Sequence, residues 1–159
     1  VISPHNPFKE TTGLLNEYNR FHLVQKAIED DPRMKASDIE FSLPRPSYTT
    51  HTLTYLREKY PENTFSIIMG SDSFQNLPKW NNAEIIIRDY ELIIYKRPGF
   101  EIGNTYGAKV QVMNAPLLEI SATHIREMIK SGKSVRYLLP PAVEEEIRAG
   151  GFFKYVQKK

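Results

Sequence analysis

The sequence contains no cysteine, which excludes a disulfide framework and any catalysis by a thiolate. A chain without cysteine fits a reducing cytoplasm, the location that we expect. Its apolar runs fall far short of the roughly 20 residues that span a membrane, so no membrane partner is expected. The net charge of +2, with no block of like charges, is also too small to predict a nucleic-acid partner.

The composition is that of an ordinary globular protein, with 40% hydrophobic and 25% charged residues among 159. We expect one domain over residues 1–159. Strands are predicted at 1–3, 39–43, 65–69, 91–95 and 110–113, and helices at 14–30, 47–59, 71–77, 83–88, 121–130 and 140–149. Strands that alternate with helices indicate an α/β fold, here a Rossmann-like open parallel sheet with helices on both faces.

Apolar spacing also predicts which side chains are buried. The short run 65–69 is typical of a strand that is covered on both faces of its sheet. In helix 47–59, we expect Leu53, Leu56 and Tyr60 to point inward. The inward face of helix 14–30 is expected to carry Leu14, Tyr18, Phe21, Val24 and Ile28.

Ligands of open parallel sheets bind beyond the carboxyl ends of the strands. Two polar segments in such positions are 70–72 and 97–98, each directly after a predicted strand. Glycine at position 70 allows a close backbone approach, and Asp72 can accept hydrogen bonds from ribose hydroxyls. From these residues alone, a turn glycine and a helix cap are the simpler explanation.

A third polar segment, 121–126, begins a predicted helix. Helix N-termini offer unpaired backbone N–H groups and the positive end of the helix dipole. Hydroxyls from Ser121 and Thr123 and the guanidinium of Arg126, one turn on, would suit a polyphosphate there. An ordinary serine cap with a solvated arginine explains the pattern equally well. Together the three segments predict a nucleotide site at one edge of the sheet.

Several motifs follow one another in a fixed order along nearly the whole chain, at residues 3–9, 46–53, 68–72, 79–80, 96–99, 120–126 and 135–140. This ordered set resembles the bacterial nicotinate-nucleotide adenylyltransferases of the nucleotidyltransferase α/β-phosphodiesterase superfamily. The resemblance implies transfer of AMP from ATP to nicotinate mononucleotide, with release of pyrophosphate, in NAD biosynthesis. It also implies that Mg²⁺ accompanies the ATP phosphates.

The resemblance assigns roles residue by residue. ATP would be bound by Gly70, Asp72, Arg97, Ser121, Thr123 and Arg126. The nicotinate ring would stack on Trp80, with Thr49 near its carboxylate, and Lys9 is a candidate phosphate ligand. Read alone, Trp80 is more simply a packed loop anchor and Thr49 a helix cap. No residue is assigned to a metal.

Two departures from the family pattern affect these expectations. The family's opening strand and its His-x-Gly-His turn, which binds the ATP phosphates, are missing, and His5, His22, His51 and His124 lack the spacing to replace it. No catalytic residue is therefore assigned. We expect roughly 30 residues, one strand–helix unit, to precede Val1, and the chain as given to be inactive alone. Ala122 stands where the family usually has a second serine, which should weaken phosphate contact without abolishing it.

Alternative functions stay open at the level of sequence. The acceptor could be the amidated nucleotide or another phosphate compound such as phosphopantetheine, although the runs at 46–49 and 79–80 favour the acid. The missing histidine motif leaves a nucleotide-binding module without catalysis as a rival. A generic structural α/β domain is a third alternative, which the ordered motifs disfavour. A homo-oligomer is compatible with all of these.

Overall fold

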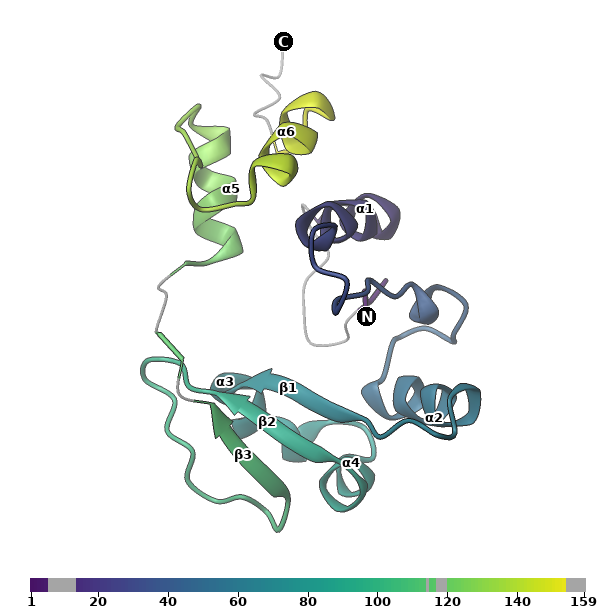
Figure 1. The fold of residues 1–159 in the computed structure, drawn as a ribbon. Helices are drawn as coiled ribbons and strands as arrows, with labels where there is room; N and C mark the ends of the chain where they lie inside the picture. The colour runs from purple at the N-terminus through teal and green to yellow at the C-terminus, as the bar shows by residue number, and fades with distance from the viewer. Residues whose placement is uncertain (6–13, 114, 117–119, 154–159) are drawn as a thin grey trace. The chain divides into compact units, whose positions relative to one another are not determined.

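The computed structural model of the chain describes residues 1–5, 14–113, 115–116 and 120–153. Its contacts fall into two compact units, drawn together in Figure 1. One consists of Val1–Ser42 with Glu119–Lys159 and is called the helical unit below. The other, Leu43–Leu118, is called the sheet unit.

The sheet unit is built on three parallel strands in the order β1-β2-β3 (Figure 1). These are β1 (Ser66–Gly70), β2 (Glu91–Tyr95) and β3 (Lys109–Met113). Their register pairs Gly70 with Tyr95 and Tyr95 with Met113, so the carboxyl ends of the strands are level. The prediction of an open parallel α/β sheet is confirmed.

Helical segments connect the first two strands, as parallel pairing requires. The chain passes from β1 through α3 (Ser71–Gln75), the 3-10 helix η2 (Leu77–Lys79) and α4 (Ala83–Asp89) before it enters β2. Helix α2 (Thr49–Lys59) precedes the sheet. Helices α2, α3 and α4 were predicted, with ends that shift by at most two residues, whereas η2 was not predicted.

One face of the sheet forms the core of this unit. Leu92 and Ile94 alternate along β2 and are 0% exposed. They form a cluster with Phe74 of α3, Leu77 of η2 and Ile86 of α4, each at most 1% exposed. Burying such side chains contributes about 1.5–3 kcal/mol each, so this cluster fixes how the helices lie against the strands.

The expectation that 65–69 is covered on both faces is wrong, because Ile68 is 69% exposed. Side chains alternate along a strand, so Ile68 lies on the face opposite the buried Met69. The same open face carries a polar row across the three strands. Glu91 accepts a hydrogen bond from Ser66 Oγ at 3.4 Å and pairs with Lys109 Nζ at 3.3 Å.

The helical unit contains α1 (Glu17–Ile28), η1 (Ile39–Phe41), α5 (Ala122–Lys130) and α6 (Pro141–Ala149) (Figure 1). Helix α1 packs against α6 and is tied to it by His22 Nε2 and Glu146 Oε2, 3.0 Å apart. Asn16 caps α1 by accepting a hydrogen bond from the backbone N–H of Asn19. Past the end of α5, Gly132 has a φ of +68°, a conformation that favours glycine.

Two predicted strands of this unit are wrong. Residues 39–43 contain a 3-10 turn, closed by the Phe41 N–H on the Asp38 carbonyl at 2.8 Å. The ring of Phe41 packs edge-on against Tyr18 and Phe21, so the apolar alternation serves packing against α1 rather than a sheet. Residues 1–3 form no strand; the N–H of Ile2 makes a single backbone bond to Ser37 O.

Some side chains predicted to point inward are exposed. Leu14 is 47% and Tyr18 is 68% exposed, and Leu14 precedes the first turn of α1. Tyr60 is 42% exposed, while Leu53 on the same helix is buried. Helical spacing identifies the apolar face of a helix. How much of that face is covered by another element depends on tertiary packing.

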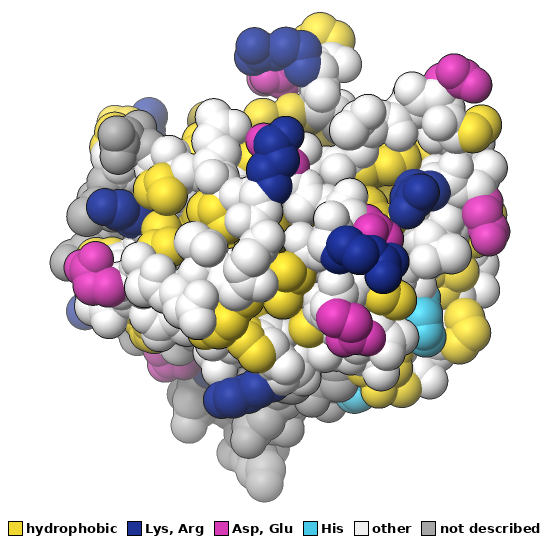
Figure 2. Space-filling view, turned by 90° about the horizontal axis from the view of Figure 1, so that it is seen from below, with side chains coloured by type: hydrophobic (Ala, Val, Ile, Leu, Met, Phe, Trp, Pro, Cys, Tyr) yellow, Lys and Arg dark blue, Asp and Glu magenta, His cyan; other side chains and the backbone are white. Residues whose placement is uncertain are grey.

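No helix among the residues that the structure describes is long and apolar enough to cross a membrane. On the face drawn in Figure 2, Lys and Arg side chains lie beside Asp and Glu rather than forming a region of one sign. This mixture agrees with the small net charge of the sequence.

Candidate functional site

Three of the predicted site residues meet at the carboxyl ends of β1 and β2. Gly70 ends β1, Asp72 lies in the first turn of α3, and Arg97 follows β2. The guanidinium Nη1 of Arg97 lies 3.2 Å from Asp72 Oδ2. The edge that was expected to bind a ligand therefore carries an acidic and a basic side chain in contact.

The glycine at position 70 is required by this pair of side chains. A Cβ there would collide with Asp72 Oδ1 and would lie 3.0 Å from Arg97 Cδ. Its φ of −73° is accessible to any residue, so the requirement is space rather than conformation. A larger residue would push Asp72 and Arg97 out of their present positions.

The two carboxylate oxygens of Asp72 have different surroundings. Oδ2 pairs with Arg97, whereas Oδ1 is buried and has no hydrogen-bond partner among the described residues. A buried acceptor without a partner is unfavourable by roughly 1–3 kcal/mol. A sugar hydroxyl could donate to this oxygen only after the Asp72 side chain turns outward, because Oδ1 is inaccessible in this structure.

Further contacts hold the loop after β2. The backbone N–H of Arg97 donates to Ser71 Oγ at 2.9 Å, and the N–H of Phe100 donates to the Arg97 carbonyl at 3.1 Å. From α3, Gln75 Nε2 donates to the carbonyl of Glu101 at 2.8 Å. The bonds to Ser71 and from Gln75 tie residues 97–101 to the segment that follows β1, and the bond from Phe100 closes the turn within them.

In the helical unit, Ser121 is the N-cap of α5, as the sequence allowed. Its Oγ accepts a hydrogen bond from the backbone N–H of His124 at 3.1 Å. The hydroxyl hydrogen of Ser121 remains able to donate to an anion, so capping and anion binding are compatible. Thr123 Oγ1 accepts from Arg126 Nη2 at 3.1 Å, which brings two more of the predicted residues together.

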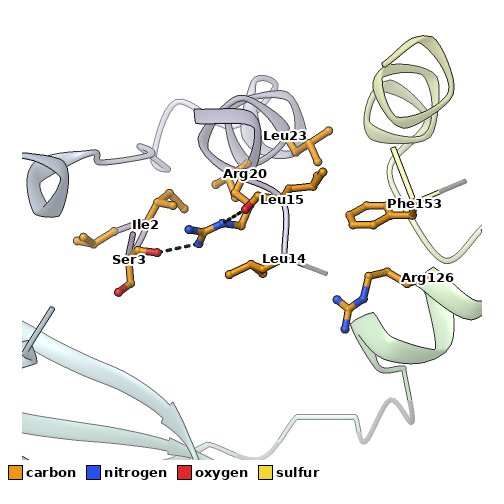
Figure 3. Close-up of a pocket in the computed structure, with 10 residues that line it drawn as sticks. Ile2, Ser3, Leu14, Leu15, Arg20, Leu23, Arg126 and Phe153 are labelled. Atoms are coloured by element: carbon orange, nitrogen blue, oxygen red, sulfur yellow. Dashed lines mark hydrogen bonds between the residues drawn. The ribbon is translucent and has the colours of Figure 1, made fainter. Parts of the chain in front are cut away.

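Arg126 also borders a cavity of about 400 Å³ in the helical unit (Figure 3). The cavity is mostly apolar and is lined by Val1, Ile2, Ser3, Leu14, Leu15, Arg20, Leu23, Val24, Arg126 and Phe153. Arg20 donates to the carbonyls of Ser3 at 2.7 Å, Leu15 at 3.0 Å and Pro4 at 3.2 Å. These bonds of Arg20 were not predicted from the sequence. The acceptors at Ser3 and Pro4 are distant in the chain, and they are backbone carbonyls, which every residue has.

The residues predicted to bind the nicotinate ring lie in the sheet unit. Thr49 is the first residue of α2 and is half-buried; the cap position itself is Tyr48. Trp80 is half-buried and packs against the core cluster, as a loop anchor does. The buried Thr50 donates to the carbonyl of Asn81 at 3.5 Å, which joins the start of α2 to the loop after Trp80.

Two further predictions concern Lys9 and the metal. Lys9 lies outside the described residues. Within the described ranges, no three His, Cys, Asp or Glu side chains gather in a way that could hold a metal ion. Asp72 is the acidic side chain at the strand edge, and one of its oxygens is already paired with Arg97. This donor set fits an ion that arrives with a phosphate chain rather than one held in a protein cage.

Comparison with known proteins adds an independent line of evidence. A sequence profile of the family described as Cytidylyltransferase-like matches residues 1–128. The chain is 46% identical over 156 residues to a protein of Cytophaga hutchinsonii that bears the name "Probable nicotinate-nucleotide adenylyltransferase", covering 96% of this chain and 80% of that protein. It is 45% identical over 148 residues to a protein of the same name from Bacteroides fragilis, with 92% and 74% covered.

A solved structure supports the fold. The chain is similar to the nicotinic acid mononucleotide adenylyltransferase of Plasmodium falciparum complexed with NaAD, with a TM-score of 0.77 at 19% identity. The likeness covers 98% of this chain and 82% of that one. At this level of identity it bears on the fold alone, and it agrees with the Rossmann-like architecture expected from the sequence.

Proposed function

The chain belongs to the cytidylyltransferase-like family and, within it, to the nicotinate-nucleotide adenylyltransferases, and from this premise we propose that it transfers the adenylyl group of ATP to nicotinate mononucleotide. A phosphate oxygen of the mononucleotide bonds to the α-phosphorus of ATP, and the bond from that phosphorus to the bridging oxygen breaks. Nicotinate adenine dinucleotide and pyrophosphate are the products. The observation that carries the proposal is the 46% identity over 96% of the chain.

In this reaction the strand edge of the sheet unit binds ATP. Asp72, whose side chain is 32% exposed, accepts a hydrogen bond from a ribose hydroxyl. Gly70 leaves the space that the Asp72 and Arg97 side chains occupy at this edge. Arg97, whose side chain is 48% exposed, directs its remaining N–H groups at phosphate oxygens.

The first turn of α5 binds phosphate. Ser121 donates its hydroxyl hydrogen while its oxygen caps the helix, and Arg126 adds a guanidinium whose orientation is set by Thr123. Mg²⁺ that arrives with the ATP phosphates would supply charge neutralisation for the departing pyrophosphate. The chain's own contribution is to hold the phosphate chain in line for the attacking oxygen, which is where such transfers gain most of their rate.

The acceptor is bound through Thr49, Trp80 and Lys9. Trp80 offers a flat face for the nicotinate ring, and the hydrogen bond from Thr50 to Asn81 keeps that loop beside the start of α2. Thr49 lies in the first turn of α2, where the positive end of the helix dipole suits a carboxylate better than an amide. On this basis the acid form is the acceptor. The proposed location is the cytoplasm, as expected for a chain without cysteine.

The experiment that tests the proposal measures pyrophosphate release with ATP and Mg²⁺. Nicotinate mononucleotide is compared with its amide at equal concentrations. Faster release with the acid form supports the proposed acceptor. Equal or faster release with the amide would overturn the choice of acceptor. Release with neither is what the missing histidine motif predicts for the chain as given, and it would leave nucleotide binding without catalysis as the function of this chain.

A further inference from the structure

Ser71 is a polar residue of the strand edge to which sequence reasoning gave no role. It lies between Gly70 and Asp72, at the first position of α3, and it is 0% exposed. Its Oγ accepts a hydrogen bond from the backbone N–H of Arg97 at 2.9 Å. The two residues are 26 positions apart in the chain, so this bond joins the segments that follow two neighbouring strands.

This bond differs from the other link between the same segments. The ion pair of Asp72 and Arg97 joins side chains that are 32% and 48% exposed, so solvent weakens it. The bond to Ser71 joins a buried hydroxyl to the backbone, where water cannot replace the acceptor. Ser71 therefore fixes the main chain of Arg97, while Asp72 influences only where its guanidinium points.

The difference becomes important when a phosphate arrives. A phosphate oxygen competes with Asp72 for the N–H groups of the Arg97 guanidinium, because both are anionic acceptors. The backbone N–H of Arg97 takes no part in that exchange. Its bond to Ser71 can persist and keep the arginine at the edge of the sheet.

We propose that Ser71 is a positioning residue whose buried hydroxyl fixes the main chain of Arg97 so that the guanidinium meets the phosphates of ATP. This inference rests on the proposed function, since it takes ATP as the ligand of Arg97. Ser71 itself touches no substrate. It acts through Arg97, and its removal should matter only while that arginine is present.

The test is a double-mutant cycle on ATP binding, measured by calorimetry with the purified protein and MgATP. Ser71→Ala should raise the Kd for ATP about tenfold, which is the loss expected when a buried hydrogen bond is removed. Arg97→Ala should raise the Kd by about tenfold or more, and the double variant should bind no more weakly than Arg97→Ala alone. Ser71→Cys keeps the shape with a weak acceptor and should behave like Ser71→Ala.

The matched control is Ser73→Ala, two residues further along α3. Among the described residues, Ser73 makes no side-chain hydrogen bond, and we expect its loss to leave the Kd unchanged. Amide hydrogen exchange supplies a readout that does not depend on ATP. The Arg97 amide should exchange faster in Ser71→Ala than in the wild type, while amides within β2 stay protected.

Results that contradict the role of Ser71 can be told apart from results that contradict the proposed function. If Ser71→Ala weakens ATP binding equally with and without Arg97, Ser71 does not act through that residue and the inference is wrong. An unchanged Kd for ATP in Ser71→Ala, or an unchanged exchange rate of the Arg97 amide, would also overturn the inference. Neither result would contradict adenylyl transfer. A wild-type protein that does not bind ATP would instead overturn the proposed function and the role of Ser71 with it.

Discussion

The sheet unit and the helical unit bury their apolar side chains to different degrees. In the sheet unit, the most deeply buried large side chains are at most 1% exposed: Phe74, Leu77, Ile86, Leu92 and Ile94. In the helical unit, the buried apolar side chains are 4–9% exposed, and α1 contains no buried residue at all. The sheet unit has a fully buried core, whereas the helical unit is held together by helices whose packed side chains remain partly exposed.

The candidate ligand-binding residues of the two units differ in the same way. Arg97 is bonded to Ser71 and Asp72, which lie 26 and 25 positions away in the chain. Ser121 and Thr123 are exposed, and each makes its bond to a residue three positions away. Substitutions should therefore act through the tertiary structure in the sheet unit and through the helix end in the helical unit.

The largest expected effect tests the burial of the sheet unit by comparing a buried and an exposed isoleucine of the same sheet. Ile94→Ala empties a fully buried position and should lower the free energy of unfolding by about 2–5 kcal/mol. Ile68→Ala removes the same atoms from a side chain that is 69% exposed and should cost less than about 1 kcal/mol. Urea unfolding followed by circular dichroism measures both values. Equal losses would mean that the open face of the sheet is covered as well as the core face.

A smaller effect is expected at the start of α5. Ser121→Ala removes the N-cap and should destabilise the helix by about 1 kcal/mol, seen as faster amide exchange in its first turn. Thr123→Ala is the matched control, because that hydroxyl accepts from a side chain and caps nothing. Faster exchange in β2 as well would show that the two units are not independent in this respect.

The smallest effect concerns two surface carboxylates, one in each unit. The side-chain hydrogen bond from Arg88 holds the pKa of Asp89 below its usual value, and Arg33 does the same for the pKa of Asp31. A lowered pKa in the folded state stabilises the protein above about pH 4, and this contribution is lost as the pH falls through the lowered pKa.

Arg88→Gln should therefore raise the pKa of Asp89 towards its usual value and leave Asp31 unchanged. Arg33→Gln should have the converse effect. A titration of the carboxyl carbons by NMR measures both pKa values in each variant. An Asp89 pKa that does not move would show that its second neighbour, Arg57, at 3.9 Å, is the dominant partner.

The elements with strong local signals were predictable from the sequence. Strand 91–95 was predicted with its observed bounds, and helix 121–130 was predicted with the observed end of α5 at Lys130. The run 39–43 was misread, because its alternating apolar residues pack on α1 through Phe41 rather than pair with a strand. The exposure of Ile68 was also not predictable, since burial depends on which elements cover a face and not on the strand's own residues.

The candidate site was likewise predictable from the sequence only in part. The positions of segments 70–72 and 97–98 directly after two predicted strands indicated one shared edge, and the structure places Gly70, Asp72 and Arg97 there. The roles of Ser71 and Arg20 could not be predicted, because each bonds to a backbone group far along the chain. The single domain over residues 1–159 stays a prediction. So do the ligand roles of all the candidate residues, which are Thr49, Trp80 and Lys9 for the acceptor and Gly70, Asp72, Arg97, Ser121, Thr123 and Arg126 for ATP.

The most direct test of adenylyl transfer follows the two ends of ATP separately. ATP labelled at the α-phosphorus is incubated with Mg²⁺, nicotinate mononucleotide and the protein, and a parallel sample carries the label at the γ-phosphorus. The account predicts that the α label moves into nicotinate adenine dinucleotide and the γ label into pyrophosphate. An α label found only in AMP or ADP would contradict it, because ATP would then be hydrolysed rather than joined to the acceptor.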